Sequence, residues 1–133
     1  MENNKITFDE FKKTEIKIGE ILSAEKVPET DKLLKLSVNF GEDLPRQIVS
    51  GISFYFSDEK MLVGKKCAFV TNLEPRTIRG LESNGMILAV SGLKPSADGS
   101  ADHPSGDLGE SAGQEFFSLL ETLPDVLPGS AVK

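Results

Sequence analysis

The sequence predicts a mainly β protein built around a small barrel of five strands. Short segments in which apolar and polar residues alternate are separated by turn residues, as expected for strands with one buried face. Most connections between these segments are too short for the crossover helices that parallel strands need. The 133 residues provide one domain with a real core, and their 38% hydrophobic content is typical of a soluble globular protein.

A short helix is predicted before the strands. Thr7-Phe-Asp-Glu10 is a capping box, in which the Thr7 hydroxyl accepts from the Glu10 backbone N–H and the Glu10 side chain reaches back. Ile6 and Phe11 flank this box at the spacing of a hydrophobic staple. The helix is expected to end near Lys13.

The first strand is predicted over residues 15–25, where Ile16, Ile18 and Ile21 are apolar and Gly19 is a candidate bend point. The other predicted strands cover residues 34–40, 46–50, 66–71 and 85–90. A short helix is predicted over 57–64, between the third and fourth strands. Five strands with a helix in this place match the OB-fold, a small, partly open barrel.

Three parts of the chain are expected from these patterns. Residues 1–93 form the barrel domain. Residues 94–115 are an acidic, Gly/Ser-rich excursion that cannot bury a core and is expected to be mobile. Residues 116–133 are a C-terminal extension with apolar residues, which must pack on this barrel or on a dimer partner.

Several classes of function are disfavoured by composition. A single cysteine, Cys67, and a single histidine, His103, argue against disulfides, a zinc site and a Cys–His catalytic pair, and neither a metal nor another cofactor is predicted. The sequence has no Gly-rich phosphate loop. We therefore expect a binding module with no catalytic residues. The sequence also has no apolar run of signal-peptide or membrane-spanning length, which favours a cytoplasmic protein.

The net charge of −6 argues at first against a nucleic-acid partner. Most of this charge lies from Lys94 onwards, where seven acids and two bases give −5 and leave −1 for residues 1–93. Because a binding patch is a local feature, the overall acidity leaves room for a basic site on the barrel.

Two loops carry the candidate binding residues: the loop between the first and second strands, and the loop between the fourth and fifth. Arginine and lysine suit phosphate, Asn and Ser can bond sugars or base edges, and methionine offers a soft apolar surface. Each residue also has an ordinary structural interpretation, such as a solvated arginine, a turn asparagine or a core methionine. The candidates are Lys32, Asn72, Arg76, Arg79, Ser83 and Met86.

Seven motifs follow one another in order over residues 6–93. They are Phe8-Asp-Glu-Phe, Ile16-Lys-Ile-Gly-Glu-Ile21, Asp31-Lys-Leu-Leu-Lys-Leu36, Gln47-Ile-Val-Ser-Gly-Ile52, Val63-Gly-Lys-Lys66, Asn72-Leu-Glu-Pro-Arg76 and Arg79-Gly-Leu-Glu-Ser-Asn-Gly-Met86. This ordered set resembles the tRNA-binding domain family. The family includes the C-terminal domain of bacterial methionyl-tRNA synthetase, free-standing bacterial tRNA-binding proteins, endothelial monocyte-activating polypeptide and yeast aminoacylation cofactor domains.

The resemblance implies that the six candidate residues line a surface for the outer corner of tRNA. It also implies a homodimer and a role beside an aminoacyl-tRNA synthetase, as a methionyl-tRNA synthetase beta-subunit-like module. The alternative is a dimeric, export-related chaperone that binds peptides, because the resemblance extends to such a protein. This chain departs from the family at Val27-Pro28, where many members have His-Pro, and in its acidic excursion.

Overall fold

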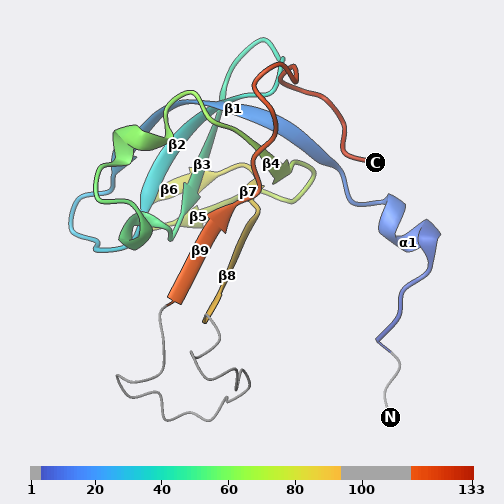
Figure 1. Cartoon of the computed structure of the whole chain (residues 1–133), viewed down its shortest axis with the longest axis horizontal. Coiled ribbons are helices and arrows are strands. Elements are labelled where there is room, and N and C mark those ends of the chain that lie inside the picture. Colours follow the sequence, from blue (N-terminus) through green and yellow to red (C-terminus); the bar gives the residue numbers. More distant parts are fainter. Residues whose placement is uncertain (1–3, 94–114) are drawn as a thin grey trace, which may run out of the picture.

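The computed structural model describes residues 4–93 and 115–133. Five antiparallel strands form one sheet in the order β3-β2-β1-β4-β7, which curls into a nearly closed barrel (Figure 1). The strands are β1 (Ile16–Lys26), β2 (Leu34–Asn39), β3 (Arg46–Ser50), β4 (Lys66–Val70) and β7 (Met86–Ile87). The prediction of a mainly β OB-fold barrel is confirmed.

Alternating side chains build the core of the barrel. Along β2, Leu34, Leu36 and Val38 are fully buried, while the intervening side chains are only partly covered. The register of β1 against β2 shifts between Ile21 and Ser23, two residues beyond the expected bend at Gly19. Gly19 is required for close packing instead, because a Cβ there would lie 2.5 Å from Val38 Cγ1.

The helices are short. In α1 (Phe8–Lys12) the predicted capping box is present, with Thr7 Oγ1 accepting from the Glu10 N–H at 3.0 Å. The helix expected over 57–64 is instead a single 3₁₀ turn, η2 (Glu59–Leu62), preceded by another, η1 (Ser53–Tyr55). Gly64 N–H donates to Ile21 O at 2.8 Å, and this bond to β1 turns the chain away from further helix.

A hairpin that the sequence analysis missed follows β4. The segment predicted as a polar loop contains β5 (Arg76–Ile78) and β6 (Leu81–Ser83), which pair with each other. Arg79 and Gly80 form the two-residue turn, with φ angles of 52° and 81°. Positive φ at both positions is the type I′ pattern, which matches the twist of paired strands.

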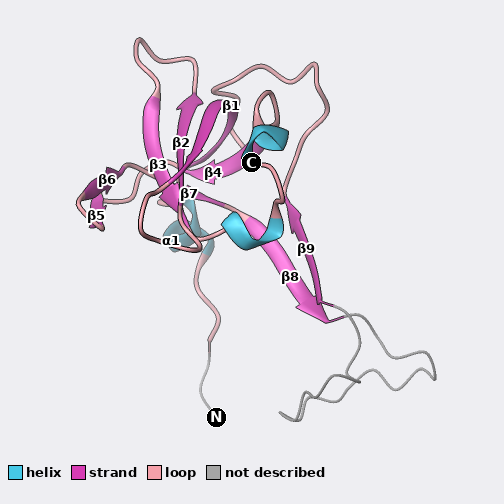
Figure 2. Ribbon diagram, turned by 90° about the vertical axis from the view of Figure 1, so that its left-hand side faces the viewer, coloured by secondary structure: helices cyan, strands magenta, loops and turns pink. Residues whose placement is uncertain are grey.

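A second hairpin projects from the barrel (Figures 1 and 2). It consists of β8 (Ala89–Leu93) and β9 (Glu115–Leu119), so the apolar run that begins at Phe116 forms a strand. The Phe117 ring stacks on Tyr55 of η1 with a centroid separation of 4.0 Å. The excursion predicted over 94–115 lies outside the described residues except for Glu115, which begins β9.

The C-terminal segment lies along its own barrel. Leu120 O accepts from the Ala68 N–H of β4 at 2.9 Å, and Ser130 O accepts from the Ile18 N–H of β1 at 2.9 Å. β2 pairs with β1 only from Glu20 onwards, because β2 ends at Asn39. The tail pairs with the earlier part of the same edge of β1. In the described ranges, no helix has the length and apolar character needed to span a bilayer.

Candidate functional site

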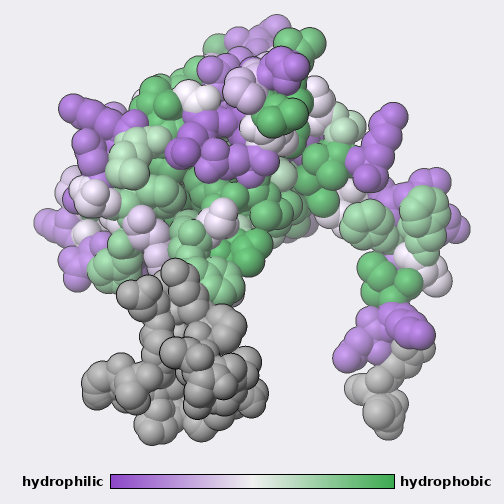
Figure 3. All heavy atoms as spheres, viewed as in Figure 1, coloured by the Kyte–Doolittle hydropathy of each residue, from purple (hydrophilic) through white to green (hydrophobic). Residues whose placement is uncertain are grey.

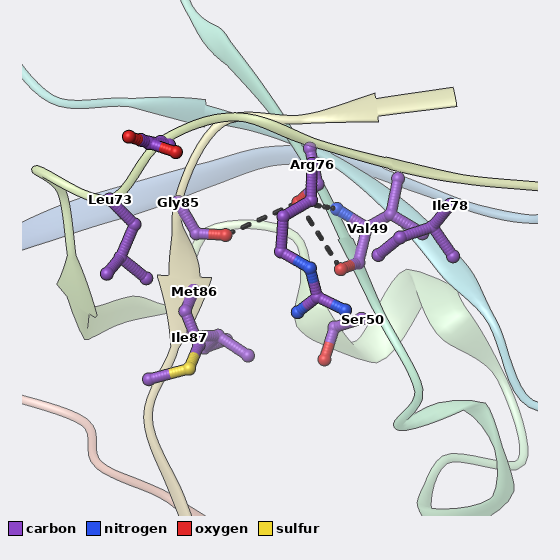
Figure 4. A pocket seen from close by; sticks show the side chains of 10 residues that line it. Val49, Ser50, Leu73, Arg76, Ile78, Gly85, Met86 and Ile87 are labelled. Atoms are coloured by element: carbon purple, nitrogen blue, oxygen red, sulfur yellow. Dashed lines mark hydrogen bonds between the residues drawn. The ribbon is translucent and has the colours of Figure 1, made fainter. Parts of the chain in front are cut away.

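A small open pocket of about 60 Å³ lies where β3, the β5–β6 hairpin and β7 meet (Figure 4). Its wall is largely apolar, and Arg76 extends along it between Met86 and Ser50. The lining residues are Val49, Ser50, Leu73, Glu74, Arg76, Ile78, Ser83, Gly85, Met86 and Ile87. Three of the six predicted site residues, Arg76, Ser83 and Met86, therefore meet at one place.

Arg79 and Lys32 are not among the lining residues, but both belong to segments that adjoin elements of the pocket. Arg79 lies at the tip of the hairpin whose first strand begins with Arg76, and it is exposed. The backbone of Lys32 is held beside the end of β3, because its carbonyl accepts from the Ser53 N–H at 3.0 Å. A Cβ on Gly51, the residue after β3, would lie 4.0 Å from the Lys32 carbonyl oxygen, so the Lys32 backbone is near the strand end whose Ser50 lines the pocket.

The cations of the site differ from four other cations of the described chain in having no acidic partner. Lys17, Lys35, Arg46 and Lys65 each form an ion pair with a glutamate. In the part of the chain that the structure describes, Lys32, Arg76 and Arg79 form none, so Lys32 does not pair with Asp31. Their charges are therefore free to meet an anionic ligand.

Arg46 shows what a structural arginine looks like in this protein. Its guanidinium makes two hydrogen bonds to the Glu42 carboxylate, at 2.8 and 3.0 Å, and a third to Thr71 O at 2.7 Å. The hydrogen bond with Arg46 lowers the pKa of Glu42, and the same bond raises the pKa of Arg46. Arg46 is thus committed to the fold, in contrast to Arg76 and Arg79.

Met86 is 45% exposed although it belongs to a barrel strand. Its neighbour Ile87 is buried, so the side chain of Met86 lies on the outer side of β7, at the pocket. Met86 thus adds an exposed, polarizable apolar surface to the pocket beside Arg76.

Asn72 has both polar atoms of its side chain engaged in the fold. Its Oδ1 accepts from the Glu15 N–H at 2.8 Å, and its Nδ2 donates to Lys13 O at 2.6 Å. These bonds tie the junction of α1 and β1 to the chain that leads into the pocket. Asn72 does not line the pocket, whereas the next residue, Leu73, does.

Ser83 is only 4% exposed. Its Oγ accepts from the Val49 N–H at 2.9 Å and lies 3.3 Å from Gly85 O, an acceptor for the hydroxyl proton. Ser83 therefore joins the hairpin to β3 from beneath the pocket. Val49 and Ser50, which form the β3 side of this site, were not predicted as site residues, although Gln47-Ile-Val-Ser was among the motifs of the resemblance.

Nothing in the described residues suggests a reactive centre. Burial raises the pKa of the Cys67 thiol to about 12, which keeps it protonated at neutral pH. Among residues 4–93 and 115–133 there is no cluster of three His, Cys, Asp or Glu side chains that could hold a metal ion. The pocket itself combines apolar lining residues with one cation, Arg76.

Comparisons with known proteins place this arrangement in a family. Residues 16–110 match the family model described as "Putative tRNA binding domain". The methionine–tRNA ligase of Methanospirillum hungatei is 56% identical over 84 residues. These residues are 63% of this chain and 12% of that enzyme, so the chain spans only about an eighth of the length of this relative.

Solved structures agree with the fold. A MetRS-related protein from Pyrococcus horikoshii is 34% identical, with a TM-score of 0.72, and the match covers 100% of both chains. The chaperone CsaA from Bacillus anthracis is 20% identical, with a TM-score of 0.68, and the match covers 97% of this chain and 99% of that one. At that identity the likeness concerns the fold alone.

Proposed function

Since this chain belongs to the tRNA-binding domain family, we propose that it binds the outer corner of folded tRNA through the pocket and the cations that flank it. The observation that carries this proposal is the set of three exposed cations, Lys32, Arg76 and Arg79, that lack acidic partners in the described residues. Two of them, Arg76 and Arg79, lie on one hairpin, where both guanidinium groups can meet the phosphates of one anionic ligand.

The six candidate residues take two kinds of role in this proposal. Arg76 and Arg79 bond phosphates through their planar donors, and Lys32 acts as a point charge. Met86 supports a base or ribose beside Arg76. Asn72 and Ser83, whose polar atoms are engaged in the fold, serve the surface by fixing the ends of the segment that carries it. We expect no catalysis and no cofactor.

Titration of tRNA with the purified protein at several salt concentrations tests this function. Each phosphate contact releases condensed counterions, so the logarithm of the affinity should fall linearly with the logarithm of the salt concentration. Three cationic contacts give a slope of roughly −2 to −3. A protein that does not bind tRNA even at low salt would contradict the proposal.

The replacement Arg79→Asn separates binding from stability. Arg79 has a φ of 52°, which asparagine tolerates better than arginine and which the first position of a type I′ turn requires. We expect the free energy of unfolding to stay the same or rise by a few tenths of a kcal/mol, and tRNA affinity to fall roughly tenfold. Urea denaturation and a binding titration measure the two effects, and unchanged affinity would show that Arg79 is only a surface residue.

The proposal includes a homodimer that acts in the cytoplasm beside an aminoacyl-tRNA synthetase. Although the tail lies along its own barrel, Leu123 and Leu127 are 72% and 71% exposed. In α1, Phe8 and Phe11 are also exposed, and Figure 3 shows apolar side chains on this helix standing apart from the barrel. Large apolar side chains exposed on both terminal segments are typical of an interface. A two-fold dimer would cover them and present two binding sites to one tRNA.

Light scattering over a range of concentrations tests the dimer. We expect about twice the 14.4 kDa chain mass at micromolar concentration. The double replacement Leu123→Ser and Leu127→Ser should shift the mass towards that of a monomer without unfolding the barrel, because both side chains are exposed in a single subunit. A parent protein that remains monomeric at all concentrations would contradict the dimer and leave tRNA binding to be judged separately.

The peptide-binding chaperone remains the competing hypothesis, and the site favours RNA over it. A peptide-binding surface needs an extended apolar groove, whereas this pocket is only about 60 Å³ and has Arg76 along it. The two unpaired arginines of the hairpin match phosphate better than an apolar peptide. Competition decides between them: tRNA binding should persist in the presence of excess unfolded peptide.

A further inference from the structure

Side-chain hydrogen bonds, more than backbone ones, connect β3 to the β5–β6 hairpin and so close the barrel on this side. β3 is the last strand of the five-stranded sheet, and β5 and β6 form a separate two-stranded sheet. In the described residues, one backbone hydrogen bond joins β3 to the chain directly after β6, from the Asn84 N–H to Gln47 O at 2.8 Å. The neighbouring bonds are made by the side chains of Ser83 and Gln47. We call this junction the seam.

Ser83 stands in for a missing strand bond. The Val49 N–H of β3 donates to Ser83 Oγ at 2.9 Å, where a neighbouring strand would offer a carbonyl. In the hairpin, Ser83 is the residue directly opposite Arg76. Fixing Ser83 to β3 therefore fixes the cross-strand pair to which Arg76 belongs.

Gln47 holds the next pair of the hairpin. Its Nε2 donates to Glu82 O at 2.9 Å, and Glu82 lies opposite Thr77. The two side-chain hydrogen bonds thus attach two successive cross-strand residue pairs of the hairpin to β3, and the hairpin has three such pairs. Because a two-stranded hairpin alone is marginal in water, its orientation depends on such attachments.

We propose that Ser83 and Gln47 are positioning residues, which hold the β5–β6 hairpin so that Arg76 and Arg79 face the same ligand. This inference rests on the proposed function, since its ligand is tRNA. Arg76 and Arg79 occupy the beginning and the turn of this hairpin, so a small rotation at the seam moves both guanidinium groups. Ser83 acts without touching RNA, because its hydroxyl is buried and its bonding capacity is used within the protein.

The replacements Ser83→Ala and Gln47→Ala test this role, because neither removes a charge. In each variant we expect tRNA affinity to fall roughly fivefold to tenfold, and the salt slope to become shallower by about one as a phosphate contact is lost. Ser83→Thr keeps the hydroxyl and should restore most of the affinity and the slope. Gln47→Ala, at a half-buried position, provides the test if Ser83→Ala fails to fold.

Hydrogen exchange adds a local measurement. The Val49 amide should lose protection by at least about tenfold in Ser83→Ala, because it loses its acceptor. Ile18→Val is the matched control: it trims a buried side chain in β1, away from the seam, and should lower stability while leaving the salt slope unchanged. All binding is measured at a temperature at which circular dichroism shows each variant to be folded.

The outcomes separate this inference from the function on which it rests. If the parent does not bind tRNA, the proposed function fails. If the parent binds, and Ser83→Ala and Gln47→Ala keep its affinity and salt slope, then the positioning role is wrong and the proposed function stands. If Ile18→Val lowers the slope as much as the seam variants do, the effect comes from general loss of stability and the positioning role is again wrong. The positioning role is supported if the salt slope becomes shallower only in the seam variants and the Val49 amide loses protection in Ser83→Ala.

Discussion

Replacing Arg76 and Arg79 together by alanine is expected to weaken tRNA binding by about a hundredfold. Hydrogen bonds to charged groups contribute about 1.5–3 kcal/mol each, and two lost bonds at the lower value correspond to this factor. The salt slope should become shallower by up to about two, one for each phosphate contact. Neither side chain forms an ion pair in the described residues, so little direct loss of stability is expected.

The control for this double variant removes two positive charges elsewhere. Lys60 is exposed in η2, and Lys65 pairs with Glu121 at 3.3 Å, so both lie outside the pocket. Lys60→Ala with Lys65→Ala changes the net charge by the same amount and should weaken binding only slightly, through long-range attraction. Equal losses in the two double variants would mean that the pocket cations have no specific role.

The replacement Gly129→Ala is expected to lower the free energy of unfolding by about 3 kcal/mol. Gly129 has a φ of 89°, which an alanine adopts only with strain. The added Cβ would also collide with the backbone carbonyl oxygen of Phe40. Relief of that collision pulls the tail away from β1 and breaks the 2.7 Å bond from the Gly129 N–H to Ile18 O.

Gly64→Ala is the matched control for Gly129→Ala. Gly64 has a similar φ of 92°, yet no atom lies within 4 Å of the position its Cβ would take. Gly64→Ala should therefore lower the free energy of unfolding only by the cost of placing an alanine at positive φ, about 1 kcal/mol. Urea denaturation of both variants measures the difference. Equal losses would show that the tail is not packed against the turn after β2 as described.

The strands of the barrel were predictable because each has a strong local signal. The alternation of Leu34, Leu36 and Val38 sets one face of β2 towards the core, and the observed burial follows it. The capping box at Thr7 was equally local, since all its atoms lie within four residues. In both cases the structure that neighbouring residues favour locally is the one found in the folded protein.

The β5–β6 hairpin was not predictable in the same way. Each strand has only three residues, too few to show an alternating pattern, and the turn begins with Arg79 where Asn or Gly is the usual signal. The strand β9 was hidden for a different reason. Its partner β8 lies more than twenty residues earlier in the chain, and the run at Phe116 has no alternation.

The candidate site was predicted in part. The exposed cations follow from the residue types and the resemblance, and the structure brings Arg76 and Met86 into one pocket. The burial of Ser83 and the engagement of Asn72 could not be read from the sequence, because their partners, Val49 and Glu15, lie 34 and 57 residues away. Contacts at such separations depend on the closed barrel.

The most direct measurement of the central claim compares two RNAs at equal length and equal salt concentration. One is folded tRNA, and the other is a single strand of the same length that cannot form the tRNA corner. Because Arg76 and Arg79 lie on a hairpin that Ser83 and Gln47 bond to β3, we expect the surface to match the shape of folded RNA. Gel retardation should show tighter binding of tRNA, at least about tenfold at physiological salt. Equal affinity for the two RNAs would contradict structure-specific binding and reduce the site to a general polyanion surface.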